Sequence, residues 1–158
     1  MSEATIHLTG ALDPRSGWEA TDCPVASALG LVGNRSAFLL LREAFYGTTR
    51  FDDFAHRVGV SESVAAARLK DLVDAGLLAR RPYREPGART RYEYGLTEMG
   101  REFFPVLAAL MTWGDRWVRP ARVELRHHDC GAPVHVELLC AAGHPVEDVD
   151  LGARGKVS

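Results

Sequence analysis

The chain has 158 residues, of which 46% are hydrophobic and 25% charged, and its formal net charge of −2 excludes a polycation; this is ordinary for one globular domain with a modest appendage. No apolar run reaches the roughly 18–20 residues that span a bilayer, and the N-terminus lacks a signal-peptide pattern, so we expect a cytoplasmic protein without membrane contact. The three cysteines lie far apart, which argues against a disulfide-stapled secreted scaffold.

Two helices are predicted in the first third of the chain, after an arm over residues 1–20 that a partner would order. Pro24 suits the first turn of a helix, and Val25 and Leu29 lie on one of its faces. A second helix follows, with Asn34 as a suitable N-cap. Its apolar run "AFLLL" is too continuous for an exposed helix, so this helix should be central.

A helix-turn-helix pattern comes next, in "TTRFDDFAHRVGVSESVAAARLKDLVDAG". Thr49 with Asp52 three residues later resembles a capping box. Gly59 ends the first, short helix, Ser61 caps the second, and Gly76 terminates it. A short helix, a tight glycine turn and a second capped amphipathic helix are typical of a DNA-binding helix-turn-helix.

The residue pattern after Gly76 changes from helical to that of β-strands. The segments "LLARRPYR" and "TRYEYGL", on either side of a Glu-Pro-Gly turn, predict a β-hairpin. From Arg80 to Arg91 there are five arginines and one glutamate, a local net charge of +4. Such a hairpin suits contact with DNA phosphates or the minor groove, while the preceding helix enters the major groove. The alternative is a small α+β domain with a solvated, charged hairpin.

Thr97 is predicted to cap one long helix, "EMGREFFPVLAALMTWGDRWV", which Pro105 should kink. Its apolar residues cover more than one face, so the helix needs a second surface to bury against. In a chain of this size that surface is most simply another copy, which predicts a homodimer.

The remaining residues, 119–158, are predicted to form a small β-rich extension that ends in a disordered tail, "LGARGKVS". His127 precedes Cys130 by three positions, and His144 follows Cys140 by four. Zinc takes tetrahedral thiolate and imidazole ligands, so these four residues could form a zinc-ribbon-like site. The spacing is irregular, and a degenerate knuckle without metal or a plain hairpin with surface histidines remains open.

Signals of catalysis are poor. The sequence lacks a phosphate-binding GxxxxGK[ST] loop, a GxSxG elbow and an HExxH motif. The paired acids Asp52 and Asp53 are explained more simply by the dipole at the start of a helix. We therefore expect no enzyme.

The motif order "CPV…GNR…LLLRE…VGVS…AGLLARRPY…YEYGLTEMG…WGDRW", over residues 23–117, resembles the HxlR family of bacterial winged helix-turn-helix regulators. The resemblance implies a mainly α fold with a β-hairpin wing over residues 21–118 and dimerisation through the terminal helices. It also implies binding to inverted-repeat operators, with one recognition helix per half-site. Many members respond to toxic, oxidative or electrophile stress.

Carried onto this sequence, the resemblance and the residue types imply a DNA-binding set from helix and wing: Ser61, Ser63, Ala67, Arg68, Lys70, Arg84, Arg89 and Arg91. The dimerisation set implied by the two end helices is Val25, Leu29, Phe103, Leu107, Leu110, Trp113 and Trp117. Two departures stand out, because Ser36 occupies a position that is usually tryptophan and the recognition helix is less polar than is usual.

Cys23 matches the N-terminal cysteine that some relatives oxidise to sense electrophiles. A helix N-terminus lowers a thiol pKa and raises its reactivity. Without a second cysteine nearby in the sequence, a small buried residue in the dimer interface is the favoured interpretation of Cys23. The sequence thus predicts a DNA-binding repressor acting as a homodimer on double-stranded DNA, with a small-molecule or electrophile effector as a further partner. The alternative is a ligand-, redox- or zinc-responsive sensor or interaction module with weakened sequence-specific DNA binding.

Overall fold

The computed structural model describes residues 6–10, 23–84, 86–87 and 89–154, so most of the predicted arm lies outside the described residues. The helices are α1 (Pro24–Val32), α2 (Arg35–Phe45), α3 (Phe51–Val58), α4 (Glu62–Asp74), α5 (Glu98–Glu102), α6 (Phe104–Trp117) and the short η4 (Asp148–Asp150). The strands are β1 (His7–Thr9), β2 (Leu78–Tyr83), β3 (Arg91–Leu96) and β4 (Gly152–Arg154). Among these helices none is long and apolar enough by itself to cross a membrane, and α1 with α2 meets that test only as a pair bent by 79°.

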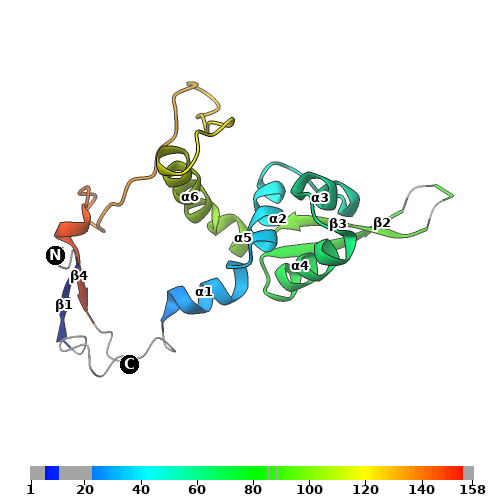
Figure 1. Ribbon diagram of the computed structural model, residues 1–158, viewed down its shortest axis with the longest axis horizontal. Helices are drawn as coiled ribbons and strands as arrows, with labels where there is room; N and C mark the ends of the chain where they lie inside the picture. The colour runs from blue at the N-terminus through cyan, green and yellow to red at the C-terminus, as the bar shows by residue number, and fades with distance from the viewer. Residues whose placement is uncertain (1–5, 11–22, 85, 88, 155–158) are drawn as a thin grey trace.

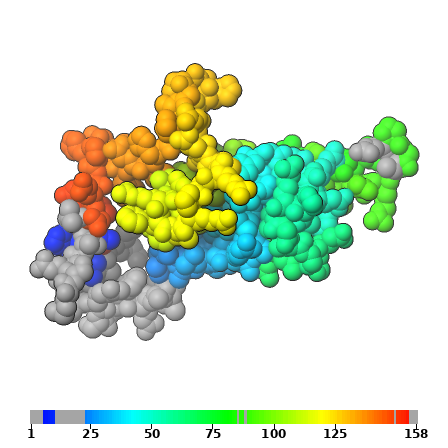
Figure 2. Space-filling model, turned by 45° about the horizontal axis from the view of Figure 1, so that its top comes forward, coloured from blue at the N-terminus to red at the C-terminus, as the bar shows by residue number. Residues whose placement is uncertain are grey.

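The predicted fold class, mainly α with a small β-hairpin wing, is confirmed. The β2–β3 hairpin projects from one end of the molecule, and the short pair of terminal strands lies at the opposite end (Figures 1 and 2). α2, α3 and α4 gather at the base of the hairpin, whereas α1 and α6 extend away from it. The basic hairpin and the helices α1 and α6 are therefore presented in different directions.

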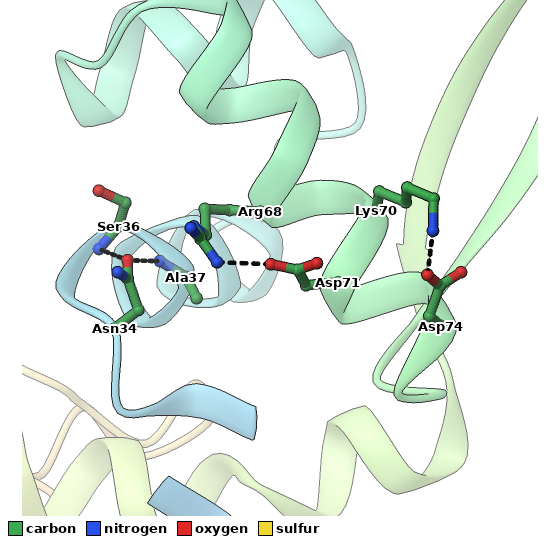
Figure 3. Close-up of polar contacts among 7 residues, drawn as sticks. All are labelled: Asn34, Ser36, Ala37, Arg68, Lys70, Asp71 and Asp74. Carbon is green, nitrogen blue, oxygen red and sulfur yellow. Dashed lines mark hydrogen bonds and ion pairs between the residues drawn. The ribbon is translucent and has the colours of Figure 1, made fainter. Parts of the chain in front are cut away.

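α2 forms the centre of the fold, as its apolar run predicts. Leu40 and Leu41 are 0% and 1% exposed, and the helix contacts α1, α3, α4 and β3. Asn34 caps α2 as predicted, because its Oδ1 accepts hydrogen bonds from the backbone N–H of Ser36 at 2.9 Å and of Ala37 at 3.3 Å (Figure 3). The cap satisfies two donors that the first turn leaves unpaired and fixes where the helix begins.

α3 and α4 form the predicted helix-turn-helix. Gly59 ends α3 with φ 70°, a left-handed conformation that glycine adopts without steric cost. Ser61 caps α4 by accepting from the backbone N–H of Val64 at 3.3 Å. Phe54 of α3 and Leu69 of α4 are fully buried, and burial of each contributes about 1.5–3 kcal/mol. These contacts hold α4 rigidly on α2 and α3 while its opposite face stays open.

The start of α3 differs from the prediction. The capping box of Thr49 and Asp52 is wrong, because Arg50 is the N-cap residue and no side chain caps the helix. Thr49 O accepts instead from the backbone N–H of Tyr94 at 2.8 Å, and Arg50 pairs with Glu93 in an antiparallel bridge. The chain before α3 therefore runs along the edge of the hairpin, which places Arg50 at the base of the wing.

The long helix predicted after Thr97 is broken into α5 and α6. Thr97 caps α5 as predicted, since its Oγ1 accepts from the backbone N–H of Gly100 at 3.0 Å. α5 ends at Phe103, and Pro105 lies in the first turn of α6. Proline has no N–H to continue the preceding helix but fits a first turn. The predicted kink is thus a complete restart, which redirects α6 relative to the wing.

The two ends of the described chain pair with each other. β1 and β4 form a parallel ladder in which Leu8 lies opposite Ala153. Residues 7–9 and 152–154 therefore depart from the predicted arm and disordered tail. Between α6 and η4 the extension has isolated bridges, Arg126 to Pro133 and Leu139 to Pro145, instead of the regular strands that were predicted. Nearly every side chain from 119 to 146 is exposed, so this segment has no core that would hold a regular hairpin.

Candidate nucleic-acid interface

The wing presents a band of guanidinium groups. Its antiparallel register runs from Leu78 opposite Leu96 to Tyr83 opposite Arg91. The exposed arginines are Arg80, Arg81, Arg84, Arg89 and Arg91. The guanidinium carbon of Arg80 lies 4.1 Å from the centre of the Tyr92 ring, a cation–π contact that positions the charge. The predicted wing arginines are therefore displayed together on one projecting element.

Arg91 has one weak partner in the described chain. Its Nη1 lies 3.8 Å from Oδ2 of Asp52, with side chains 67% and 76% exposed. An exposed ion pair of this kind contributes about 0–1 kcal/mol. Arg91 can therefore exchange this carboxylate for a phosphate at little cost.

The start of α4 is exposed but carries few groups that could read bases. Ser61 Oγ and Ser63 Oγ lie 3.0 Å apart, so each hydroxyl already has a polar neighbour, and Ser61 Oγ also accepts the cap bond from Val64. Ala66 and Ala67 are exposed one turn further on. Methyl groups can contact a thymine methyl but cannot form hydrogen bonds. This face suits close approach to a groove more than hydrogen-bonded readout.

Both predicted cations of α4 are paired with acids on the same helix (Figure 3). Arg68 Nη1 donates to Asp71 Oδ2 at 2.6 Å, and Lys70 Nζ donates to Asp74 Oδ2. The hydrogen bond to Asp74 and the charge of its carboxylate raise the pKa of Lys70. Sequence reasoning missed these pairs, although the i, i+3 and i, i+4 spacing could have revealed them. The exposed face of α4 is consequently close to neutral.

The terminal helices leave apolar side chains open. Val25 and Leu29 of α1 are 64% and 59% exposed. On α6, the predicted dimerisation residues that are exposed are Leu110, Trp113 and Trp117. A groove of about 660 Å³ lies between α1, α2 and α6, lined mainly by apolar side chains. An exposed apolar surface of this extent is typical of an interaction site.

One member of the predicted dimerisation set, Leu107, is buried, and another, Phe103, is partly buried. Leu107 is 2% exposed, and Phe103 packs edge-to-face on Phe38 of α2 with ring centres 5.5 Å apart. The restart of the helix at Phe103 turns this side of α5 and α6 onto α2. This corrects the prediction for Leu107, which lies in the core of its own chain, whereas Phe103 packs against the core and also lines the apolar groove.

Cys23 is the N-cap residue of α1. It is half-buried and carries a free thiol, and its side chain makes no capping hydrogen bond. Pro24, which follows it, lines the apolar groove. The two open interpretations, redox-sensing residue and small interface residue, both fit this position.

The four predicted zinc ligands are not brought together. His127 Nδ1 lies 3.3 Å from Cys130 Sγ at one turn, while Cys140 and His144 form a second turn through the Cys140 N–H and the His144 carbonyl. The backbone N–H groups of His144 and then Ala142 lower the pKa of the Cys140 thiol. Within the described residues no group of three or more His, Cys, Asp or Glu side chains could hold a metal ion. The exposed extension lacks packing that would bring the two turns together.

Comparison with known proteins finds a family and solved structures that are similar to this chain. A family model described as HxlR-like helix-turn-helix matches residues 31–122. An uncharacterized HTH-type transcriptional regulator of Mycobacterium tuberculosis is 43% identical over 119 residues, covering 73% of this chain and 74% of the relative. The solved structure of PA1607, described as a candidate transcription factor, is 34% identical with a TM-score of 0.73, covering 87% of this chain and 94% of its own.

A second solved structure, the redox regulator HypR in its reduced form, is 26% identical with a TM-score of 0.54 and matches 60% of this chain and 95% of its own. Its similarity is confined to a smaller part of the chain than that of PA1607. The predicted family is thereby confirmed. The chain belongs to the HxlR-like helix-turn-helix family and is a transcriptional regulator with a helix-turn-helix DNA-binding fold.

Proposed function

We propose that the protein is a repressor that binds an inverted-repeat operator in cytoplasmic DNA as a homodimer. The observation that carries this proposal is the exposed arginine wing beside the open face of α4. Most of the affinity comes from arginines on phosphates, and the dependence on salt should be steep. Specificity comes from a few contacts at the start of α4 and from the shape of the DNA.

In this proposal α4 fits the major groove closely and reads few bases by hydrogen bonds. Ala66 and Ala67 permit close approach, and Ser61 and Ser63 supply hydroxyls. The ion pairs of Arg68 with Asp71 and of Lys70 with Asp74 offset the charge of both cations and so weaken their attraction for a phosphate. Glu62, at the first position of α4, accepts only from a cytosine amino group.

The dimer forms through the exposed faces of α1 and α6 and the apolar groove between them. Burying these side chains against a second copy removes from water an apolar surface that a single chain leaves open. A twofold axis there places the two α4 helices at equivalent positions. Half-sites about one helical turn of DNA apart, roughly 34–36 Å, are then read symmetrically.

Leu110→Glu is expected to weaken the dimer at least about 10-fold, because a carboxylate would be buried without a partner. Sedimentation velocity over a range of concentrations measures this. Met99→Glu is the matched control: Met99 is 48% exposed, against 49% for Leu110, but lies outside the groove. If Leu110→Glu sediments like the parent protein, the dimer does not use this surface.

The function itself is tested by mobility shift with the DNA upstream of the protein's own gene, together with genome-wide mapping of bound DNA. We expect a shift at low salt that unlabelled operator removes and unrelated duplex does not. A folded dimer that shifts no fragment and maps to no site would favour the interaction module instead.

A redox-responsive regulator is the second candidate function, favoured by the half-buried free thiol of Cys23 beside the groove and by the similarity to HypR. The same mobility-shift assay, repeated after treatment with a thiol oxidant, distinguishes it. Loss of the shift in the parent but not in Cys23→Ser supports sensing through this thiol. Equal behaviour of the two proteins leaves Cys23 as an interface residue.

A further inference from the structure

An open pocket of about 590 Å³ lies where the start of α3 meets the wing. It is separate from the apolar groove between α1, α2 and α6 and shares no lining residue with it. Its charged lining consists of three arginines and two aspartates, and tyrosine and phenylalanine rings complete the wall. The arginines are Arg50, Arg89 and Arg91. A pocket with convergent guanidinium groups and aromatic walls is suited to an anionic ligand.

Arg50 carries an unpaired donor in this pocket. Its Nη1 is buried and has no hydrogen-bond partner, the one such side-chain atom in the described part of the chain. The guanidinium carbon lies 3.4 Å from the centre of the Tyr83 ring, so the flat face of the group is stacked on the ring. Its N–H bonds lie in the guanidinium plane, so the stack on Tyr83 does not engage them as donors.

A buried donor without an acceptor destabilises a fold and calls for an explanation. The neighbouring carboxylates do not provide one. Asp52 pairs with Arg91 at 3.8 Å, and Glu93, the bridge partner of Arg50, forms no described ion pair with it. The backbone pairing fixes Arg50 against the wing, and the stack on Tyr83 fixes its side chain. The donor is therefore held in place for an acceptor that the described residues do not supply.

We propose that the pocket at the base of the wing binds an oxyanion, with Arg50 as the principal donor and Arg89 and Arg91 as supporting cations. A phosphate or carboxylate matches the planar donor edge of a guanidinium group. The oxyanion comes from one of two sources, a free small molecule or a phosphodiester of bound DNA. Only the second source rests on the proposed function. Either source links occupancy of the pocket to the position of the wing.

The free anion is tested without DNA, by thermal unfolding of the full chain in inorganic phosphate or benzoate against chloride at equal ionic strength. At ten times the dissociation constant the midpoint should rise by roughly 3–6 °C. Arg50→Gln should lose the rise measured against its own chloride baseline. Arg50→Lys should keep part of it, because the charge remains but the planar donor edge is lost.

Arg80→Gln is the matched control for this measurement. Arg80 also stacks on a tyrosine of the wing, Tyr92, but it does not line the pocket. The control should therefore keep the full rise in phosphate or benzoate. A rise that survives in Arg50→Gln as well as in Arg80→Gln places the anion elsewhere and overturns the proposal.

The DNA phosphodiester is tested by the salt dependence of duplex binding. Arg50→Gln should reduce the slope of log K against log[salt] by about 0.9, the contribution of one phosphate. If the parent protein shows a midpoint rise that Arg50→Gln loses, and the salt slope of Arg50→Gln is unchanged, the pocket binds a free anion. If the slope is reduced in Arg50→Gln and the parent protein shows no midpoint rise, the pocket binds a DNA phosphodiester. If a folded Arg50→Gln keeps both the midpoint rise and the salt slope of the parent protein, the proposal is overturned, even if the parent protein binds its operator.

Discussion

Replacement of both Arg89 and Arg91 by alanine is expected to lower the affinity for duplex DNA by at least about 100-fold at low salt, since each charged hydrogen bond contributes roughly 1.5–3 kcal/mol. Both side chains are exposed on the wing. The fold should be unaffected, because among the described residues the ion-pair partner of Arg91 is Asp52, at a long distance on the surface. The loss should be similar for operator and unrelated DNA, because phosphate contacts carry no sequence information.

The slope of log K against log[salt] distinguishes phosphate contacts from other causes. Removing two contacts should reduce its magnitude by about 1.8. The matched control replaces Arg122 and Arg126 of the extension by alanine, which removes the same charge away from the wing. If the slope is unchanged in the wing variant, or falls equally in the control, Arg89 and Arg91 do not contact DNA phosphates.

The sequence predicted those parts of the fold that depend on local hydrogen bonds. Asn34, Ser61 and Thr97 cap helices where predicted, because a short polar side chain before an amphipathic run satisfies donors only a few residues away. Gly59 marks the helix-turn-helix because the left-handed turn lies within the motif itself. The hairpin likewise follows from its alternating pattern around a turn.

The features that were missed depend on distant parts of the chain. Thr49 and Arg50 resemble a helix start, but pairing with β3, more than 40 residues later, draws them onto the wing. β1 and β4 are three-residue strands that pair across almost the whole chain, so neither shows a period of its own. Leu107 was placed on a dimer face because the sequence predicts one long helix. The break at Phe103 redirects α6 and buries Leu107 in its own chain.

In the candidate site too, some features follow from the sequence pattern and others depend on contacts that were not predicted. Residue types and spacing were enough to place the arginines on a wing and the serines at the start of α4. The neutral character of α4 arises from pairing of Arg68 and Lys70 with acids one turn away. A recognition helix whose cations are already paired contributes less to non-specific attraction than its charges suggest. We therefore expect the wing to make most of the phosphate contacts and the shape complementarity of α4 to supply more of the specificity.

Gly100→Ala is expected to destabilise the protein by about 3 kcal/mol, at the upper end of what overpacking a core costs. A Cβ at this position would lie 2.1 Å from the carbonyl oxygen of Leu77 and 3.1 Å from its carbonyl carbon. Backbone atoms cannot rotate away as a flexible side chain can, so α5 or the start of β2 must shift. The same Leu77 oxygen accepts from the backbone N–H of Thr97 at 3.2 Å, so a shift also weakens the α5 cap.

Thermal unfolding measures this effect, and a loss of about 3 kcal/mol lowers the midpoint by roughly 6–12 °C in a chain of this size. Gly95→Ala is the matched control, because a Cβ there has no atom within 4 Å; its stability should change by less than about 0.5 kcal/mol. Equal midpoints for the two variants would show that α5 does not press against the start of β2. Because α5 joins the wing to α6, the predicted loosening should also weaken DNA binding in Gly100→Ala at temperatures where the domain is still folded. This would show that the wing must be held in register with the dimer helices for both half-sites to be bound.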